Sequence, residues 1–197
     1  MKIGVLALQG DFREHIEAVK ASGHAGLSVR RPEELEEVDA LILPGGESTA
    51  IALLAQTFQI FQPIRDRIAS GMPVYGSCAG MILLADRIIY GVQDQATFGG
   101  IDMTVRRNAF GRQVDSFESD LKFNGEPLRA VFIRAPWVEE VGEKVVVLSE
   151  VDLGDGVRRP VAVRQGSLLA TSFHPELTGD LRVHRYFFDQ VCAGAIK

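Results

Sequence analysis

Cys78 lies in a segment whose residue types suit a nucleophile. Residues 75–81 read YGSCAGM, so a short strand runs into the pattern Gly-x-Cys-x-Gly and then into an apolar helix. A sharp turn from strand to helix strains its central residue, and the flanking positions must be glycine, here Gly76 and Gly80, to avoid clashes. The dipole and free amides of the helix favour the thiolate form of Cys78. The segment predicts a cysteine nucleophile, and the alternative is a small buried cysteine in a glycine-rich turn.

A thiolate nucleophile needs a base, and His174 is the candidate. It begins the string His174-Pro175-Glu176, directly after an apolar strand. Residues two positions apart in an extended segment leave the same face. Glu176 can therefore accept a hydrogen bond from one ring nitrogen of His174 while the other nitrogen faces the sulfur. The sequence predicts a triad of Cys78, His174 and Glu176.

The other histidines and the second cysteine are expected to have packing or surface roles. Three histidines fall on predicted helices or at their ends: His15, His24 and His184. Cys192 lies on the closing helix and is expected to fill core or surface space. Two cysteines in a chain of 197 residues do not form a disulfide framework, so reduced thiols are expected.

A second glycine-rich turn, residues 43–48 with the sequence LPGGES, follows a buried strand and opens a helix. Paired glycines at the end of a strand let backbone N–H groups point into a site, as an oxyanion hole requires. The amides of Gly46 and Ala79 are the candidate donors. A phosphate-binding loop is a weaker interpretation, because the lysine and the full spacing of such a loop are missing. A plain turn is the remaining alternative.

Arginines in two later segments could bind a carboxylate. Residues 106–112 read RRNAFGR and residues 133–136 read IRAP. The guanidinium fork matches the carboxylate of an amino-acid substrate. A solvated basic loop is an equally good interpretation from the residues alone.

The elements that must position these residues alternate between buried strands and amphipathic helices in the first half of the chain. Strands are expected at 3–8, 40–43 and 74–75, and helices at 11–22, 48–56, 60–70 and 79–87. Asp11 and Ser48 are the expected N-caps, and Gly23 and Gly71 are the expected stops. This pattern is typical of parallel strands joined by crossover helices.

The second half is richer in strands. Short strands are expected at 103–105, 130–133, 145–148, 160–164 and 168–173, followed by a final helix at 180–192. We see no repeat or linker that divides the chain. Residues 1–197 are therefore expected to form one α/β domain with a mixed sheet.

Composition narrows the class of protein. A net charge of -5 provides no excess of Lys and Arg to replace the counterions of a nucleic acid. The N-terminal apolar run is too short for a signal sequence, and no run approaches the roughly 18 apolar residues that a membrane span needs. We therefore expect a cytoplasmic protein.

With these residues in view, the chain resembles the glutaminase subunits of pyridoxal 5'-phosphate synthases, which are class I, or triad, glutamine amidotransferases. The likeness covers nearly the whole chain. The strings that carry it are residues 4–10, 43–48, 78–80, 107–113, 132–136 and 172–177. Residues 107–113 (RNAFGRQ) and 132–136 (FIRAP) distinguish this family from the wider superfamily. The one departure is Ser77, where relatives commonly carry Thr.

The resemblance implies a three-layer α/β/α fold of flavodoxin-like type, with a mixed, mostly parallel central sheet. It implies that Cys78, His174 and Glu176 hydrolyse L-glutamine through a γ-glutamyl thioester. It also implies glutamine contacts from six residues: Gly46, Glu47, Ser48, Arg107, Ile133 and Arg134. The implied partner is a (β/α)₈-barrel synthase subunit that uses the ammonia to build pyridoxal 5'-phosphate. No metal or cofactor is implied for this chain.

Three other functions fit some of these features. The chain could serve another synthase, such as imidazole glycerol phosphate synthase, with the same triad. It could be a stand-alone cysteine hydrolase of the related fold, active without a partner. A flavodoxin-like binding module is the non-enzymatic alternative, and it would carry a bound flavin or nucleotide.

Overall fold

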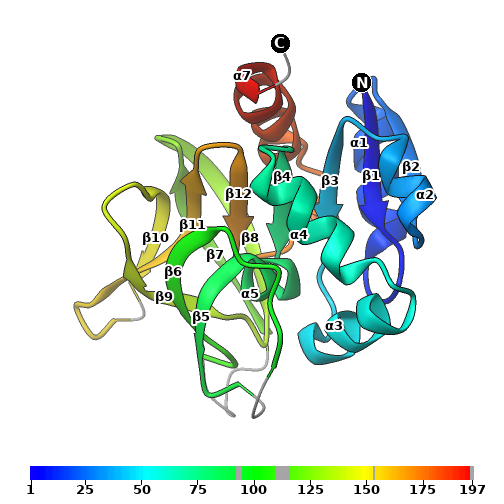
Figure 1. Cartoon of the computed structure of the whole chain (residues 1–197). Coiled ribbons are helices and arrows are strands. Elements are labelled where there is room, and N and C mark those ends of the chain that lie inside the picture. The colour runs from blue at the N-terminus through cyan, green and yellow to red at the C-terminus, as the bar shows by residue number, and fades with distance from the viewer. Residues whose placement is uncertain (92–94, 110–115, 153, 196–197) are drawn as a thin grey trace.

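A seven-stranded sheet forms the centre of the computed structural model, which describes residues 1–91, 95–109, 116–152 and 154–195 (Figure 1). The strand order is β10-β11-β12-β4-β3-β1-β2. The strands are β1 (Lys2–Leu6), β2 (Ala25–Val29), β3 (Ala40–Leu43), β4 (Val74–Ser77), β10 (Val146–Asp152), β11 (Arg158–Gln165) and β12 (Leu168–Thr171). The strands from β12 to β2 pair in parallel, whereas β11 and β10 extend the sheet antiparallel. The expected mixed, mostly parallel sheet is confirmed.

Helices and two smaller sheets cover the two faces. The helices are α1 (Phe12–Ala21), α2 (Pro32–Glu36), α3 (Ser48–Thr57), α4 (Phe61–Ala69), α5 (Ala79–Leu84), α6 (Arg182–Tyr186) and α7 (Ala193–Ala195), with a π-helical segment η2 (Phe187–Cys192) between the last two. The smaller sheets are β5 (Ala85–Ile89) with β6 (Ile101–Arg106) and β9 (Trp137–Val141), and the hairpin of β7 (Ser116–Phe123) and β8 (Glu126–Ile133).

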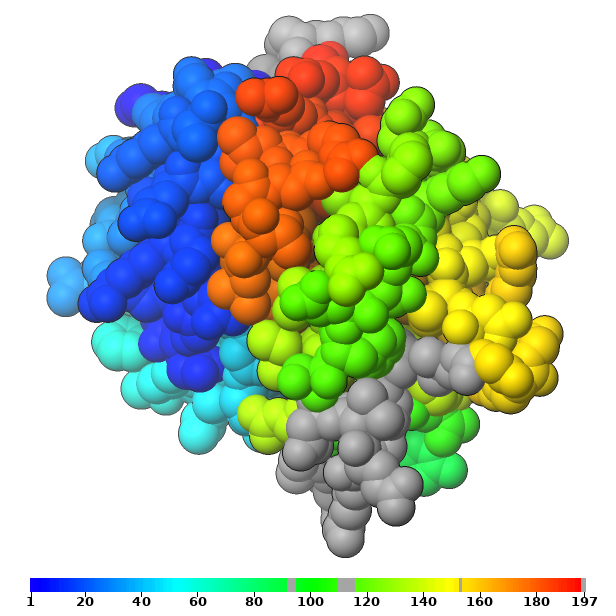
Figure 2. All heavy atoms as spheres, turned by 180° about the vertical axis from the view of Figure 1, so that it is seen from behind, coloured from blue at the N-terminus to red at the C-terminus, as the bar shows by residue number. Residues whose placement is uncertain are grey.

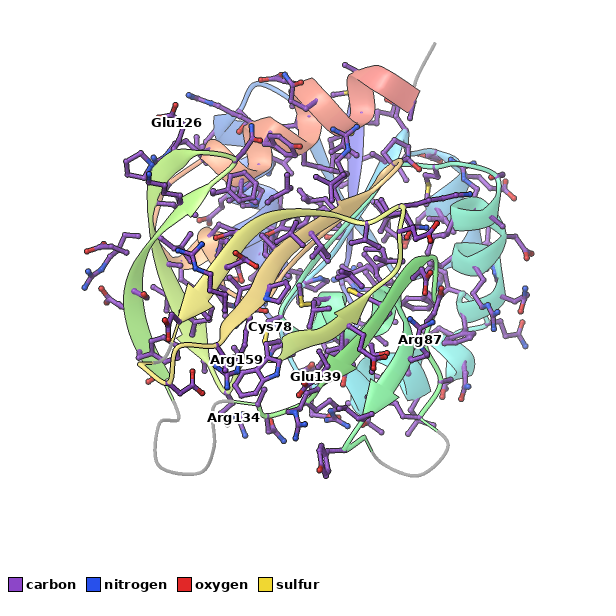
Figure 3. All side chains as sticks on the ribbon, turned by 90° about the vertical axis from the view of Figure 1, so that its left-hand side faces the viewer. Cys78, Arg87, Glu126, Arg134, Glu139 and Arg159 are labelled. Atoms are coloured by element: carbon purple, nitrogen blue, oxygen red, sulfur yellow. The ribbon has the colours of Figure 1, made fainter. Side chains whose placement is uncertain are left out.

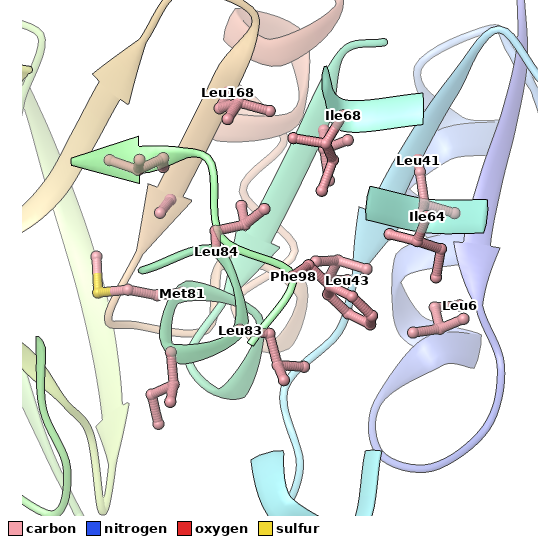
Figure 4. Packing of buried hydrophobic residues seen from close by; sticks show 14 of the residues in the cluster. Leu6, Leu41, Leu43, Ile64, Ile68, Met81, Leu83, Leu84, Phe98 and Leu168 are labelled. Carbon is pink, nitrogen blue, oxygen red and sulfur yellow. The ribbon is translucent and has the colours of Figure 1, made fainter. Parts of the chain in front are cut away.

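Two hydrophobic clusters lie on opposite faces of the central sheet. Along β3, Leu41 and Leu43 enter one cluster, which also holds residues of α3, α4 and α5 (Figure 4). Ala40 and Ile42 enter the other cluster, which holds residues of α1, the β7–β8 hairpin and the C-terminal helices. Successive side chains of a strand point to opposite faces, so β3 is apolar throughout because both faces are covered.

The chain leaves the expected elements at two places near the site. The helix expected at 79–87 ends at Leu84, and residues 85–89 form β5, which pairs in parallel with β6. Pairing with a distant strand there overrides the local helical pattern. Ser48 is not the N-cap of α3, because the Glu47 carboxylate accepts hydrogen bonds from the amides of Thr49 and Ala50. Asp11 does occupy the N-cap position of α1, without a capping hydrogen bond from its side chain.

The expected helix stops are confirmed. Gly23 and Gly71 follow α1 and α4 with φ angles of +84° and +94°. Glycine adopts this left-handed conformation without steric penalty, so it ends a helix readily. Strand β2 and helix α2, which the sequence did not predict, lie between Gly23 and β3. Strands β7 and β9 were also not predicted.

Candidate active site

Cys78 stands at the carboxyl end of β4, beside the end of β12. The two strands are parallel neighbours in which Thr171 pairs with Ser77. The Cys78 amide donates a 2.8 Å hydrogen bond to the Thr171 carbonyl, which fixes the turn to the neighbouring strand. Cys78 itself has φ 49° and ψ -99°, a conformation that non-glycine residues rarely adopt. The predicted strained turn between strand and helix is therefore present.

The glycines on either side of Cys78 are required by close backbone contacts. A Cβ atom on Gly76 would lie 2.4 Å from the Gly80 carbonyl, and one on Gly80 would lie 2.2 Å from the Leu43 carbonyl oxygen. Both distances are far below van der Waals contact, so any larger residue would force the backbone apart. Glycine at position 80 lets the turn pack against β3, and glycine at position 76 lets the end of β4 pack against the start of α5.

His174 and Glu176 follow β12 and lie between α1 and the β7–β8 hairpin. Pro175–Leu177 forms a short 3-10 turn, η1, that contacts both α1 and β8. Figure 2 shows the segment after β12, in orange, running between the blue N-terminal region and the green hairpin. The His174 amide donates a 2.9 Å hydrogen bond to the Val131 carbonyl of β8. His174 is therefore fixed by its backbone as well as by its side chain.

The side chains of His174 and Glu176 form a buried pair. His174 Nδ1 lies 2.7 Å from Glu176 Oε1, and the Glu176 side chain has no exposed surface. His174 Nε2 is also buried and has no hydrogen-bond partner among the described residues. The carboxylate accepts the Nδ1 hydrogen, so Nε2 of the neutral ring is left as the free base.

Burial and the neighbouring groups pull the pKa of His174 in opposite directions. Burial alone would lower it, but the neighbouring Cys78 and Glu176 side chains together raise the pKa to about 10. The pKa of Glu176 is raised by burial, and its hydrogen bond to His174 opposes that rise. The raised pKa of His174 favours its protonated form, in which the ring can donate a hydrogen from Nε2 as well as from Nδ1.

A pocket of about 390 Å³ opens beside Cys78 and His174. All six residues expected to contact glutamine line it: Gly46, Glu47, Ser48, Arg107, Ile133 and Arg134. In Figure 3, Cys78 lies well inside the ribbon and Arg134 lies nearer the molecular surface. The Cys78 thiol is 3.9 Å from the Ile133 carbonyl oxygen, which brings the 132–136 segment against the nucleophile. The structure therefore gathers these residues in one cavity, which has the size of a small-molecule site.

Arg107 and Glu47 hold one wall of this pocket together. The Arg107 guanidinium lies 2.8 Å from Glu47 Oε1 and also donates to Gln95 Oε1 and Thr49 Oγ1. Gln95 in turn donates to Ser48 Oγ. The Arg107 guanidinium, which was expected to bind the carboxylate of the substrate, binds the Glu47 carboxylate in this structure. Residues 110–113 of the family string lie outside the described residues.

The two candidate oxyanion donors come from different segments: Gly46 lines the pocket, and Ala79 follows Cys78 in the chain. Gly46 lines the pocket with φ +149°, and a Cβ atom there would lie 2.4 Å from Gln9 Oε1. Ala79 is the first residue of α5, directly after Cys78. The first amides of a helix have no partner within the helix, so the Ala79 N–H is suited to an oxyanion. The role of both amides stays a prediction.

Sequence reasoning missed several residues of this site. Gln9 and Asn108 line the pocket, and Gln9 Oε1 accepts a 2.8 Å hydrogen bond from the Glu47 amide. His15 was expected to have a packing or surface role. It is fully buried, and its Nε2 lies 2.9 Å from Ser77 Oγ and 3.5 Å from Glu176 Oε2. A histidine facing the buried side of α1 was the available signal, but only the fold brings it to Glu176.

Asp11 adds a second carboxylate beside His174. Its Oδ2 lies 3.5 Å from His174 Nδ1, and the two residues with Glu176 place ligand-type atoms within 4.8 Å of one another. Such spacing is open to a metal ion. The 2.7 Å hydrogen bond between His174 Nδ1 and Glu176 Oε1 uses two of these atoms and explains their approach without an ion.

Comparison with known proteins decides the family. The model of the SNO glutamine amidotransferase family matches residues 5–193. The chain belongs to the SNO glutamine amidotransferase family. It is therefore a glutamine amidotransferase, as the resemblance of the sequence implied.

Individual relatives of this amidotransferase are similar to it over nearly the whole chain. The protein named pyridoxal 5'-phosphate synthase subunit PdxT from Kineococcus radiotolerans is 62% identical over 194 residues, covering 96% of this chain and 94% of the relative. A protein of the same name from a Nocardioides species is 61% identical over 191 residues, covering 96% and 95%. The family and these two relatives thus extend over nearly the whole amidotransferase chain.

Solved structures show the same fold. A crystal structure described as a glutamine amidotransferase superposes with a TM-score of 0.89 at 50% identity, covering 97% of this chain and 98% of that one. The PurLQS structure from Thermotoga maritima gives a TM-score of 0.70 at 17% identity, covering 95% and 97%, and shares the fold. No helix among the described residues of the amidotransferase is long and apolar enough to cross a membrane.

Proposed function

We propose that this amidotransferase hydrolyses L-glutamine with Cys78 as nucleophile, His174 as general acid and base, and Glu176 as the group that orients His174. The observation that carries the proposal is the buried 2.7 Å contact between His174 Nδ1 and Glu176 Oε1 beside a cysteine held at positive φ in the same pocket. Its chemistry requires neither a metal nor a cofactor.

The first half-reaction forms a thioester. The Cys78 thiolate attacks the carboxamide carbon of glutamine, and the oxygen becomes an anion that backbone amides at Gly46 and Ala79 stabilise. Protonated His174 gives its Nε2 hydrogen to the nitrogen as the carbon–nitrogen bond breaks. Ammonia leaves, and a γ-glutamyl group stays on the sulfur.

The second half-reaction restores the enzyme. His174, now neutral, takes a proton from a water molecule, and the resulting hydroxide attacks the thioester carbon. The carbon–sulfur bond breaks, glutamate leaves, and the sulfur departs as a thiolate. His174 ends protonated, with its charge stabilised by Glu176 at Nδ1.

We propose that the ammonia goes to the synthase subunit of a pyridoxal 5'-phosphate synthase, which the family resemblance gives a (β/α)₈-barrel form. The relatives from Kineococcus and Nocardioides, at 62% and 61% identity, are named as subunits of that synthase. The chain is proposed to act as one glutaminase domain over residues 1–197, because the family model spans residues 5–193. A cytoplasmic location suits a nucleophilic thiol that must stay reduced.

The synthase subunit that activates glutamate release distinguishes this proposal from the alternative functions. Glutamate release is measured for the chain alone, with the synthase subunit of a pyridoxal 5'-phosphate synthase, and with that of imidazole glycerol phosphate synthase. We expect release to rise at least about tenfold with the first partner only, because we propose that docking of the synthase orders the oxyanion donors. A rise with the second partner alone would support histidine biosynthesis. Full activity without any partner would indicate a stand-alone hydrolase.

A further inference from the structure

His15 lies behind the triad, in a chain of buried polar groups that the mechanism above does not use. It belongs to α1, and its side chain is fully buried. Its Nδ1 lies 2.9 Å from His184 Nε2, and its Nε2 lies 2.9 Å from Ser77 Oγ. The same Nε2 is 3.5 Å from Glu176 Oε2. Both histidines are neutral, because burial lowers the pKa of His15 well below its usual value and that of His184 to about 4.

The hydrogen on His15 can be assigned from the partners of His184. His184 Nδ1 is buried and has no hydrogen-bond partner among the described residues. Buried N–H groups without a partner are rarer than acceptors without one, so the single ring hydrogen of His184 belongs on Nε2. That N–H then donates to His15 Nδ1. The hydrogen of His15 is therefore on Nε2, where it faces Ser77 Oγ and Glu176 Oε2.

This orientation matters because Glu176 needs a second donor. Oε1 accepts from His174, but Oε2 is buried with no hydrogen-bond partner within ordinary distance among the described residues. A buried carboxylate that lacks donors is unstable in its charged form. The charge of Asp11 further disfavours ionisation of Glu176. The Nε2–H group of His15 lies 3.5 Å from this oxygen.

We propose that His15 is a positioning residue for Glu176: its Nε2–H group keeps the carboxylate ionised and fixes its orientation toward His174. The inference rests on the proposed triad and deepens it. His15 does not touch substrate, so it acts on the reaction only through Glu176 and His174. The other groups that face Glu176 are His174, Asp11 and the fully buried Tyr75.

The kinetic test compares three variants in complex with the synthase subunit. His15→Leu removes the N–H group, His15→Gln keeps an N–H donor at a similar reach, and His24→Leu is a control on a histidine that packs on Phe188 away from the triad. We expect His15→Leu to lower kcat by about 10- to 100-fold with a KM for glutamine within about twofold of wild type. We expect His15→Gln to recover most of that loss. His24→Leu should match wild type.

The pH profile distinguishes a positioning role from a structural one. Without the His15 donor, Glu176 takes up a proton at higher pH, so the acid limb of kcat/KM should move up by about one pH unit in His15→Leu. A merely structural role would reduce the amount of folded enzyme but leave this limb in place. Wild-type activity in His15→Leu, or equal losses in His15→Leu and His15→Gln with an unchanged limb, would overturn the inference.

A measurement on the wild-type chain keeps the inference testable if the variants fail to fold. In wild-type protein labelled with ¹⁵N-histidine, we expect His15 to carry its hydrogen on Nε2. Finding the hydrogen on Nδ1 would overturn the inference. An inactive wild-type complex would instead contradict the proposed function, so the two failures are distinct.

Discussion

Ser77 and Thr171 occupy paired positions on β4 and β12, two neighbouring parallel strands. Each strand is followed at once by a catalytic segment, Cys78 after β4 and His174 after β12. The carboxyl ends of parallel strands meet at one end of the sheet. This register therefore brings Cys78 and His174, which are 96 residues apart in the sequence, to the same pocket. The site is thus a product of strand order as much as of local motifs.

The orienting carboxylate should be less costly to lose than the base. Glu176→Gln retains a side chain that can hydrogen-bond to Nδ1, whereas His174→Ala removes the group that moves the proton. We expect glutamate release by the complex to fall about 10- to 100-fold in the first variant and at least about 1000-fold in the second. Equal losses, measured under saturating glutamine, would contradict this ranking.

Gly45 should be required for the position of the imidazole. A Cβ atom on Gly45 would lie 2.4 Å from His174 Cε1 and 2.9 Å from Nδ1. Gly45→Ala should therefore push the ring away from Glu176 and lower kcat by about 100-fold, with the fold retained. Gly194→Ala is the matched control, because a Cβ there meets nothing within 4 Å. Wild-type turnover in Gly45→Ala would show that the ring tolerates the displacement.

Arg107 should act on glutamine binding through its fork geometry. Its side chain is only 12% exposed, and its guanidinium contacts Glu47, Gln95 and Thr49 in the pocket wall. Lysine keeps the charge but cannot make these paired contacts. We expect Arg107→Lys to raise the KM for glutamine by about tenfold with a smaller change in kcat. Arg129→Lys, on the exposed β7–β8 hairpin, should leave both constants unchanged.

Most of the candidate site could be predicted from the sequence, because each motif is local. Gly76, Cys78 and Gly80 form a turn whose strain needs only neighbouring residues, and His174 and Glu176 are two positions apart. The parallel core was also visible, since strands buried on both faces are apolar throughout.

The features that could not be predicted from the sequence depend on contacts formed only in the folded chain. Strand β5 continues an apolar helical pattern and becomes a strand only because β6 pairs with it. Glu47 replaces Ser48 as the N-cap of α3, since its carboxylate reaches the amides of Thr49 and Ala50. His15 and Glu176 are 161 residues apart in the sequence, and no local sequence pattern predicts that they lie close together.

Stability should fall in mild acid because of His184. Burial lowers the pKa of His184 in the folded protein to about 4, from the ordinary histidine value of 6.5. Between pH 6.5 and pH 4, His184 is protonated in the unfolded chain but neutral in the folded protein. The free energy of unfolding is therefore unaffected by this group above pH 6.5 and falls as the pH drops toward 4. At pH 5 this group alone should reduce the free energy of unfolding by about 2 kcal/mol.

Urea unfolding at pH 7 and pH 5 checks this prediction. The difference between the two pH values should shrink in His184→Leu and stay as in wild type in His24→Leu, which changes a partly exposed ring. The same pH dependence in all three proteins would contradict the assignment to His184.

The nucleophile is tested most directly by comparing the two cysteines. Both are buried and free, but only Cys78 lines the pocket, and burial raises the pKa of Cys192 to about 12. Glutamate release by the complex with the synthase subunit is measured for wild type, Cys78→Ala and Cys192→Ala. We expect no release above background for Cys78→Ala and release within about twofold of wild type for Cys192→Ala. Glutamine hydrolysis that survives the loss of Cys78 would contradict it.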